Sequence, residues 1–149
     1  MYDVDRRRLV MKDCNCLFCK IANGEIPSNT VYEDEDVRVI LDISPASKGH
    51  AIIIPKEHYA NIYEIEPELL AKVVKVGQRV IKHAKDVLKC DGYNLLQNNG
   101  EVAGQTIFHF HMHLIPRYAK DDNTNVLKTG HVAFTDDEFK AICEEMKLD

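Results

Sequence analysis

His109-Phe110-His111-Met112-His113-Leu114-Ile115 places a histidine at every second position of its first five residues. In an extended strand successive side chains point to opposite faces and rise about 3.3 Å per residue, so the three imidazoles would share one face at a spacing of about 6.6 Å. The apolar residues between them would then face the core. A helix would scatter the imidazoles around its axis and break the apolar face. The stretch therefore predicts a long strand, Thr106–Ile115, which Pro116 stops.

The segments around this strand indicate four further strands and two helices. Runs of β-branched and aromatic residues bounded by turn signals predict strands at Thr30–Glu33, Val37–Asp42, His50–Ile54 and Tyr93–Gln97. A short helical turn is expected over Cys16–Asn23, stopped by Gly24. The long helix opens at Pro67, continues to residue 89 and is ended by Asp91-Gly92. Its apolar residues recur at steps of three and four over a stripe wide enough to cover two surfaces.

The C-terminal part predicts one more helix, because Thr135 and Glu138 form a capping box. Short connections favour antiparallel neighbours, so the expected fold class is α+β, a mainly antiparallel five-stranded sheet with one long helix and a C-terminal helix. We expect residues 1–12 to form a flexible leader and 13–118 to form the main domain. Residues 119–149 would be a C-terminal extension packed on that same domain.

Length and charge exclude several classes of protein. The 149 residues fit one domain that can bury a core without disulfides. With 19 Lys and Arg against 24 Asp and Glu, the net charge of −5 disfavours nonspecific binding to a nucleic acid polymer or an anionic membrane. The longest aliphatic stretch, Ala51–Ile54, is far shorter than the roughly 20 residues of a membrane helix. No secretory signal is recognisable, and a cytoplasmic protein is expected.

Three of the five cysteines, Cys14, Cys16 and Cys19, lie within six residues. In a reducing compartment the Cys16-x-x-Cys19 spacing is better suited to metal binding or redox chemistry than to a structural disulfide. The pair supplies only half of a tetrahedral metal site. No βαβ unit follows it, which disfavours a thioredoxin-like redox role.

The histidine-rich face allows two kinds of chemistry. Three imidazoles on one side could bind a catalytic metal, because a His-x-His pair is a natural ligand arrangement. Alternatively an imidazole could act on phosphorus, since with an unperturbed pKa of about 6.5 it is largely neutral at pH 7 and nucleophilic. A surface strand that is merely rich in histidine is a third explanation. Against it, three of the 7 histidines in the chain share one five-residue window.

The stretch 109–115 resembles the histidine triad (HIT) family of nucleotide hydrolases and transferases, whose signature is His-φ-His-φ-His-φ-φ with φ apolar. Further blocks are similar to the Hint-like bacterial branch of that family, namely Cys16–Ile21, Gly24–Pro27, Leu41–Pro45, Gly49-His50, Ile54–His58 and Gly104–Thr106. The resemblance covers residues 16 to 118, so residues 13–118 would be a HIT domain. Members of the family are homodimers that join their strands into one continuous sheet.

The resemblance implies roles for four residues in catalysis. His111 matches the family's nucleophile, which would attack the α-phosphorus of a nucleotide conjugate and form a transient nucleotidyl-imidazole. His113 matches the residue that contacts the phosphate and helps the leaving group depart. Gln105 and Thr106 match positions whose polar groups reach the phosphate or the leaving atom.

The resemblance also implies a nucleotide pocket. Asp42 matches the ribose-binding carboxylate and Asn98 matches an amide that faces the phosphate or ribose. The apolar slot around the base would be formed by Phe18, Ile21, Ile26, Ile40 and Ile43. From the residues alone, Asp42 could equally be a turn former before Ser44, Asn98 could belong to an ordinary turn, and the apolar residues could be plain core.

In zinc-bearing relatives two cysteines and two histidines hold a structural zinc, and the matching residues here are Cys16, Cys19, His58 and His109. Two thiolates and two neutral imidazoles would balance the charge of the ion. The alternative is that both cysteines are small core residues and His58 is a solvated loop residue. His50 is interpreted as a structural histidine at the start of a strand, outside the site.

Together these observations predict a nucleotide hydrolase acting at the α-phosphate of purine nucleotide conjugates. Nucleoside phosphoramidates and other adenylyl compounds are the first expected substrates, followed by dinucleoside polyphosphates. A nucleotide-binding regulatory or scaffold protein with incidental turnover is the alternative. A metalloenzyme whose metal sits on the three histidines themselves is a third hypothesis.

Overall fold

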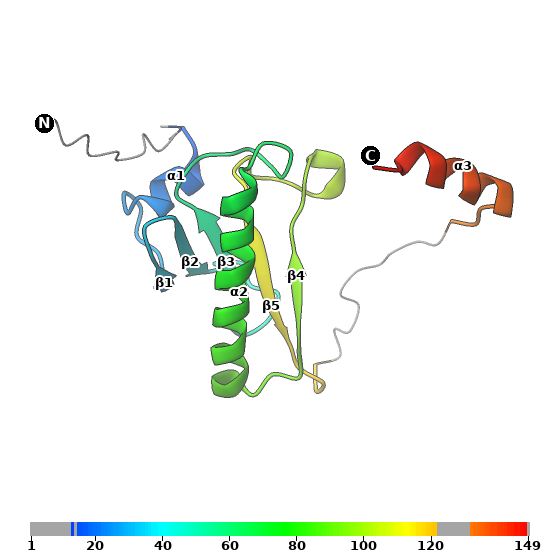
Figure 1. Ribbon diagram of the computed structural model, residues 1–149. Helices are drawn as coiled ribbons and strands as arrows, with labels where there is room; N and C mark the ends of the chain where they lie inside the picture. Colours follow the sequence, from blue (N-terminus) through cyan, green and yellow to red (C-terminus); the bar gives the residue numbers. More distant parts are fainter. Residues whose placement is uncertain (1–12, 14, 122–131, 149) are drawn as a thin grey trace, which may run out of the picture.

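A five-stranded antiparallel sheet forms the centre of the protein (Figure 1). The computed structural model describes residues 13, 15–121 and 132–148. Its strands are β1 (Thr30–Glu33), β2 (Val37–Leu41), β3 (Ala51–Pro55), β4 (Gly92–Leu96) and β5 (Met112–Arg117). Its helices are α1 (Leu17–Ala22), α2 (Pro67–Leu88) and α3 (Asp136–Met146), and a 3-10 turn, η1, spans Glu101–Ala103. The strand order is β1-β2-β3-β5-β4, which confirms the predicted α+β class with an antiparallel sheet.

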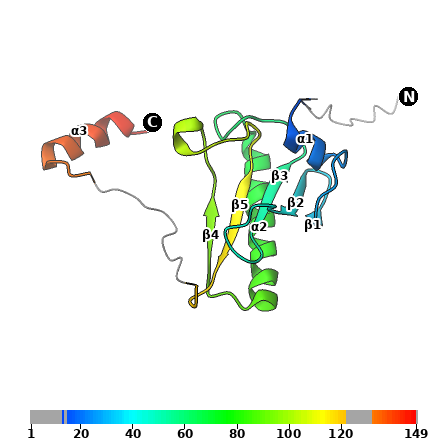
Figure 2. The ribbon, with the colours of Figure 1, turned by 180° about the vertical axis from the view of Figure 1, so that it is seen from behind.

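The two faces of the sheet are covered by different helices. The long helix α2 lies across one face, in front of the sheet in Figure 1 and behind it in Figure 2. The core under α2 contains Val37, Val39, Ala51, Ile53, Val73, Val76, Phe110, Met112 and Leu114. Strand residues that alternate with these point to the other face of the sheet, where they pack with α1. This second cluster contains Phe18, Ile21, Ala22, Ile40, Ile52 and Ile54.

Helix α2 starts and stops for local reasons. Pro67 stands in its first turn, where the missing N–H costs no hydrogen bond. A Cβ on Gly77 would lie 3.2 Å from Cδ1 of Ile53, so the glycine lets the helix approach β3 closely. The helix ends at Leu88, one residue earlier than predicted, because Lys89 adopts a left-handed conformation with φ 55°.

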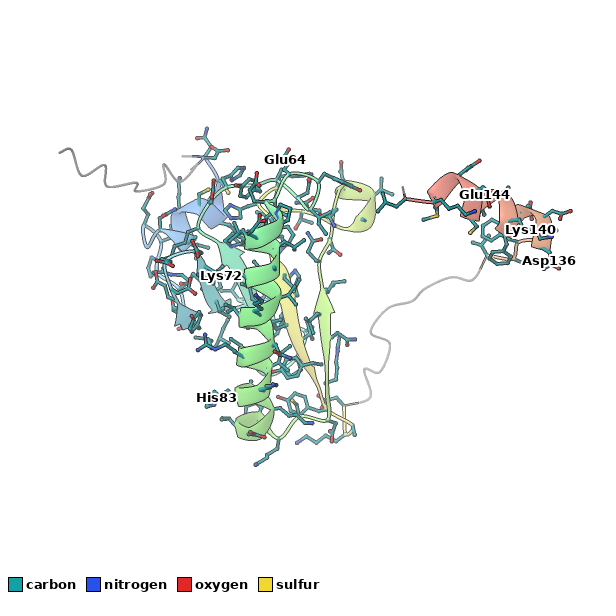
Figure 3. All side chains as sticks on the ribbon, viewed as in Figure 1. Glu64, Lys72, His83, Asp136, Lys140 and Glu144 are labelled. Carbon is teal, nitrogen blue, oxygen red and sulfur yellow. The ribbon has the colours of Figure 1, made fainter. Side chains whose placement is uncertain are left out.

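An ion cluster ties α2 to the turn between β1 and β2. Lys72 leaves the helix on that side (Figure 3), and its Nζ lies 3.3 Å from Oδ2 of Asp34 and also contacts Asp36. The other oxygen of Asp34 accepts from the N–H groups of Asp36 at 2.8 Å and Val37 at 3.0 Å. These contacts close the turn and fix the start of β2.

The predicted long strand Thr106–Ile115 is wrong at both ends, because β5 begins at Met112 and continues through Pro116 to Arg117. Strand β3 pairs with β5 only from Met112 to Leu114. At Pro116 the β3 side of the strand therefore has no ladder partner that would need an N–H, and proline is tolerated there.

The residues just before β5 use their backbone groups elsewhere. The N–H of Phe110 donates to the carbonyl of Tyr59 at 2.6 Å, and the carbonyl of His109 accepts from the His111 side chain at 2.7 Å. The alternation of side chains nevertheless persists, since Phe110 belongs to the core under α2 and the Phe18 ring on the other side packs on both His109 and His111. The predicted separation of the histidines from the apolar residues is confirmed without a regular strand.

The C-terminal helix α3 begins as predicted, with a complete capping box between Thr135 and Glu138. None of its residues is buried, and both views draw it beyond the β4 edge of the sheet (Figures 1 and 2). Packing of residues 119–149 on the main domain stays a prediction, and the expected leader 1–12 lies outside the described residues. Among the described helices none combines the length and the apolar character needed to cross a membrane.

Candidate functional site

A cavity of about 690 Å³ opens on the face of the sheet opposite α2. It collects side chains from α1, from the end of β2, from the segment that precedes β5 and from the start of β5. Its lining includes ten of the residues predicted to bind nucleotide or to act in catalysis: Phe18, Ile21, Ile26, Ile40, Asp42, Ile43, Asn98, Thr106, His111 and His113. The chain therefore brings these residues, which are far apart in sequence, to one hollow.

His111 lies in this cavity with its ring held in one orientation. Its Nδ1 is 2.7 Å from the carbonyl oxygen of His109, and because a carbonyl only accepts, Nδ1 carries the proton. In the neutral ring Nε2 then keeps a free lone pair. The Phe18 ring packs edge-on against His111 with a centroid distance of 4.9 Å. Burial lowers the pKa of His111, which favours the neutral, nucleophilic form.

A chain of two hydrogen bonds, from the Ala46 N–H to His50 and from His50 to His113, gives His113 the opposite tautomer to His111. The backbone N–H of Ala46 donates to Nδ1 of His50 at 2.9 Å, so the proton of the neutral His50 is on Nε2. That Nε2 lies 2.9 Å from Nδ1 of His113 and donates to it. His113 must then carry its own proton on Nε2. Burial, reinforced by His111 and His50, lowers the pKa of His113 to about 4 although Asp42 opposes the shift, so the ring is neutral at pH 7.

The sequence predicts that His50 lies outside the site, but the structure puts it in direct contact with the cavity residue His113. Burial lowers its pKa, against the opposing charge of Asp42. Strand β3 carries Ile52 opposite His113. Since His50 has the same parity as Ile52, the alternation along β3 was a usable signal once the pairing of β3 with β5 is known.

Asp42 forms the turn expected before Ser44 and also lines the cavity. Its Oδ1 accepts from the N–H of Ser44 at 2.8 Å, which is the turn that Asp42 was expected to form. Its Oδ2 lies 3.5 Å from Nε2 of His50 and 3.8 Å from Nδ1 of His113, so the carboxylate also faces the two imidazoles. A negative charge therefore stands at the rim of the cavity beside the histidine pair.

The loop between β4 and β5 supplies the polar wall of the cavity. Asn98 and Thr106 line it, and Nδ2 of Asn98 lies 3.5 Å from the carbonyl of Gly104. Gly104 has φ +89°, a conformation that side chains rarely adopt. Gln105 is buried outside the cavity. Its Oε1 accepts from the N–H of Gly100 at 2.8 Å and its Nε2 donates to the carbonyl of Ala60 at 2.6 Å, so the amide braces the loop, and a role in catalysis stays a prediction.

The apolar wall combines buried and open positions. Phe18, Ile21 and Ile40 are buried in the cluster under α1, so they are core and cavity lining at once. Ile43 is 95% exposed and stands at the mouth of the cavity, where a flat ring could cover it. The predicted base-binding slot is therefore buried at one side and open to solvent at Ile43.

A second group of side chains meets behind the cavity. Cys16, Cys19, His58 and His109 each direct one donor atom to a common point, and these atoms all lie within 4.8 Å of one another. We call these four residues the clamp. Nδ1 of His109 is 3.4 Å from both sulfur atoms and 3.2 Å from Nδ1 of His58, and the sulfur of Cys19 is 3.3 Å from Nδ1 of His58.

The clamp geometry fits a tetrahedral zinc ion. Zinc binds sulfur at about 2.3 Å and nitrogen at about 2.0–2.1 Å, which separates two nitrogen ligands by about 3.3 Å and nitrogen from sulfur by about 3.6 Å. The donor distances agree with these values to within a few tenths of an ångström. Nε2 of His109 lies 2.8 Å from the carbonyl of Pro55 and must donate to it, so the lone pair of Nδ1 points at the clamp centre.

Cys19 and His109 of the clamp are uncharged in the protein alone, and a bound cation would change this for the thiol. Burial, with the neighbouring Cys16 adding to it, raises the pKa of the Cys19 thiol to about 11 in the protein alone. Burial likewise lowers the pKa of His109 to about 4, so the imidazole is neutral and ready to coordinate. A bound metal ion reverses the preference of the thiols and holds them as thiolates.

Comparison with known proteins shows which family has this fold and this arrangement of histidines and cysteines. The family model described as "HIT domain" matches residues 23–120 of the chain. The chain belongs to the HIT family. The resemblance drawn from the histidine pattern is thereby confirmed, together with a Cys-x-x-Cys branch of the family.

Two relatives illustrate how far the HIT similarity extends. The chain is 47% identical over 117 residues to "Protein hit" of Bacillus subtilis (strain 168), which covers 78% of this chain and 81% of that protein. It is 41% identical over 115 residues to "Adenosine 5'-monophosphoramidase HNT1" of Saccharomyces cerevisiae (strain ATCC 204508 / S288c), covering 77% of this chain and 69% of that enzyme.

Solved HIT structures share the fold. A crystal structure of a HIT family protein from Bacillus anthracis str. 'Ames Ancestor' superposes with a TM-score of 0.81 at 42% identity, covering 89% of this chain and 95% of that one. A crystal structure of a Zn-bound histidine triad family protein from Mycobacterium smegmatis superposes with a TM-score of 0.70 at 41% identity, covering 72% of this chain and 78% of that one.

Proposed function

We propose that this HIT protein is a hydrolase that cleaves purine nucleotide conjugates at the α-phosphate through a covalent nucleotidyl-histidine. Nucleoside phosphoramidates and similar adenylyl compounds are the preferred substrates, and dinucleoside polyphosphates come second. The observation that carries the proposal is the contact between Nδ1 of His111 and the carbonyl of His109 at 2.7 Å, since it leaves Nε2 of His111 as a free nucleophile. The relative named as an adenosine 5'-monophosphoramidase supports the substrate class.

In the first step Nε2 of His111 attacks the α-phosphorus and the bond from phosphorus to the leaving nitrogen breaks. The electron pair of that bond leaves with the amine, which takes the proton from Nε2 of His113. The negative charge left on the His113 ring offsets the positive charge that the nucleotidyl-His111 ring gains, and the N–H of His50 that donates to Nδ1 of His113 stabilises it. An unprotonated amide anion is a very poor leaving group, so this proton matters most for phosphoramidates. The contact between His50 and His113 at 2.9 Å supports this assignment, because it keeps the His113 proton on Nε2.

In the second step water attacks the same phosphorus and the bond between phosphorus and His111 breaks. A proton from the water returns to His113, and the products are a nucleoside monophosphate and the restored neutral His111. Asn98 and Thr106 are placed by the proposal on the phosphate oxygens, where fixed dipoles stabilise the developing charge. Gln105 acts by holding the loop that carries Thr106.

Recognition of the nucleotide follows from the two walls of the cavity. Asp42 would accept from the ribose hydroxyls, because Oδ2 is not taken by the Ser44 turn. The base would lie on Phe18, Ile21, Ile26, Ile40 and Ile43. Stacking and burial of this kind hold any flat ring, and the larger surface of a purine favours it over a pyrimidine.

Cys16, Cys19, His58 and His109 would hold a structural zinc ion. When bound, the ion supplies a cross-link between α1, the loop after β3 and the segment before β5, and it takes no part in either chemical step. The four protein donors leave no open coordination position for substrate. This arrangement favours phosphorus chemistry over the hypothesis of a catalytic metal on the three histidines.

We further propose a cytoplasmic homodimer. The clamp needs reduced cysteines, which a reducing compartment provides. Among the described strands β4 pairs with β5 alone, and Leu95 on it is exposed, so a second copy could continue the sheet there. The net charge of −5 supports the absence of a nucleic acid or membrane partner.

The decisive experiment uses adenosine phosphoramidate labelled in the phosphate, mixed briefly with the protein and quenched in alkali. We expect label on intact wild-type protein and none on His111→Ala, which should still bind AMP by calorimetry. Equal turnover by the variant would overturn the proposal. Binding of AMP without turnover or label in the wild type would instead identify a nucleotide-binding regulatory or scaffold protein.

A further inference from the structure

His109 connects the clamp to the cavity, although its own side chain is fully buried and does not line the cavity. Its ring reaches Cys16, Cys19 and His58 through Nδ1, while its backbone carbonyl accepts from Nδ1 of His111. Its Nε2 is fixed on the carbonyl of Pro55 at 2.8 Å. The peptide of His109 therefore cannot shift without changing either the metal geometry or the hydrogen bond that orients His111.

A second link runs through α1. Cys16 is the N-cap of this helix and Cys19 lies in its first turn, so the two sulfur donors flank Phe18. The Phe18 ring packs edge-on against His111, with centroids 4.9 Å apart, and against His109 at 6.1 Å. Phe18 also lines the cavity. A helix of six residues has little stability of its own, so its position depends on what holds the two cysteines.

We infer that His109 and Phe18 are positioning residues that couple the clamp to His111, so that metal binding and nucleotide binding strengthen each other. The inference rests on the nucleotide site proposed above. Coupling of this kind is reciprocal: if the metal raises the affinity for a nucleotide, the nucleotide raises the affinity for the metal by the same factor. The clamp then does more than stabilise the fold, because binding of the metal changes the position of His111.

The test uses full-length protein loaded with Co²⁺ in place of zinc, because the visible absorption of tetrahedral cobalt reports small changes at its ligands. AMP is added at concentrations that calorimetry has found to be saturating. We expect the cobalt spectrum of the wild type to shift on AMP binding. A purely structural metal site would give the same spectrum with and without AMP, and that result would overturn the inference.

Two variants separate the coupling from nucleotide binding itself. Phe18→Leu keeps an apolar side chain and all four ligands but removes the aromatic edge, so the AMP-induced shift should shrink by half or more. Ile43 lines the mouth of the same cavity, is 95% exposed and is not one of the clamp residues, so Ile43→Ala should keep the full shift at saturating AMP even where the AMP affinity falls. A shift lost equally in both variants, or retained fully in Phe18→Leu, would contradict the role of Phe18.

A competition with a metal chelator measures the size of the coupling. AMP should tighten Co²⁺ binding by about 5-fold or more, the lower end of common coupling energies. The measurement is made where the metal-free protein retains its far-ultraviolet dichroism, so that unfolding does not contribute. An unchanged metal affinity at saturating AMP would refute the coupling and leave the hydrolase proposal intact. A calorimetric absence of AMP binding would refute the nucleotide site instead.

Discussion

The two faces of the sheet are built from the same strands but differ in what they bury. Under α2 the buried cluster is wholly apolar, and Leu114 is typical of it. On the opposite face the buried rings of His109 and His111 pack against Phe18, and the buried His50 contacts His113. A shift of one residue along β5 passes from one face to the other. The difference indicates that one face carries the stability of the fold and the other carries its chemistry.

The largest effect of this division is expected from a substitution on the face of the sheet that lines the cavity. His113→Ala should lower kcat for an amine leaving group by about 10²–10⁴-fold, because proton donation is lost. The loss should be smaller for a conjugate whose leaving group needs no proton. Thermal unfolding should stay near that of the wild type. An equal loss for both leaving groups would mean that His113 does not act as the proton donor.

Its neighbour on the strand should behave in the opposite way. Leu114→Ala removes a side chain that is 1% exposed and should lower the free energy of unfolding by about 2–5 kcal/mol. The AMP affinity of the folded protein should change little, since Leu114 points at α2. Urea titration measures the first quantity and calorimetry the second. A variant that lost AMP binding while remaining folded would break the separation of the two faces.

Removal of the metal should affect both faces through the clamp. Cys19→Ser should bind less zinc than the wild type, with a lower unfolding temperature and a weaker AMP affinity. Cys90→Ser is the matched control, because Cys90 is also a buried cysteine but lies outside the clamp, so its zinc content should equal that of the wild type. Metal analysis of both purified variants decides the matter, and equal zinc in Cys19→Ser would contradict the clamp.

The smallest effect is expected at the β1–β2 turn, remote from the cavity. Burial would raise the pKa of Asp34, but the N–H groups of Asp36 and Val37 together with Lys72 hold it below its ordinary value. A depressed folded pKa stabilises the protein above the unfolded pKa, and this contribution is lost as the pH falls through the folded value. Asp34→Asn should therefore cost about 1 kcal/mol at pH 7, and the cost should shrink as the pH falls through the folded pKa of Asp34.

Turnover at pH 7 should be unchanged in Asp34→Asn, since the turn does not touch the cavity. Denaturant unfolding at a series of pH values measures the expected convergence of the two proteins. A stability gap that persisted undiminished in acid would mean that the charge of Asp34 is not what stabilises the turn.

The sequence predicted the division of the two faces well, because it depends only on side-chain alternation along one segment. It also predicted which residues would gather at the cavity and the clamp, through their match to family motifs. The sequence-based predictions were wrong where contacts with distant segments determine the local structure. The start of β5 at Met112 depends on the carbonyl of Tyr59 binding Phe110, and the role of His50 depends on the pairing of β3 with β5. Neither partnership can be read from a single strand.

Gln105 illustrates the same limit. A motif marks the position, but the direction of the side chain depends on the backbone of Gly100 and Ala60, which lie on different segments. The end of α2 at Leu88 is a smaller case, since the sequence offered Asp91-Gly92 as the stop signal while Lys89 takes the left-handed position.

The central claim is that the carbonyl of His109 and the ring of His50 fix His111 and His113 in opposite tautomers, one offering a lone pair and the other a proton. Nitrogen-15 NMR of the histidine rings at pH 7 tests this most directly, because it distinguishes a protonated ring nitrogen from a bare one. The account predicts a proton on Nδ1 of His111 and on Nε2 of His113. A proton on Nε2 of His111 would contradict it.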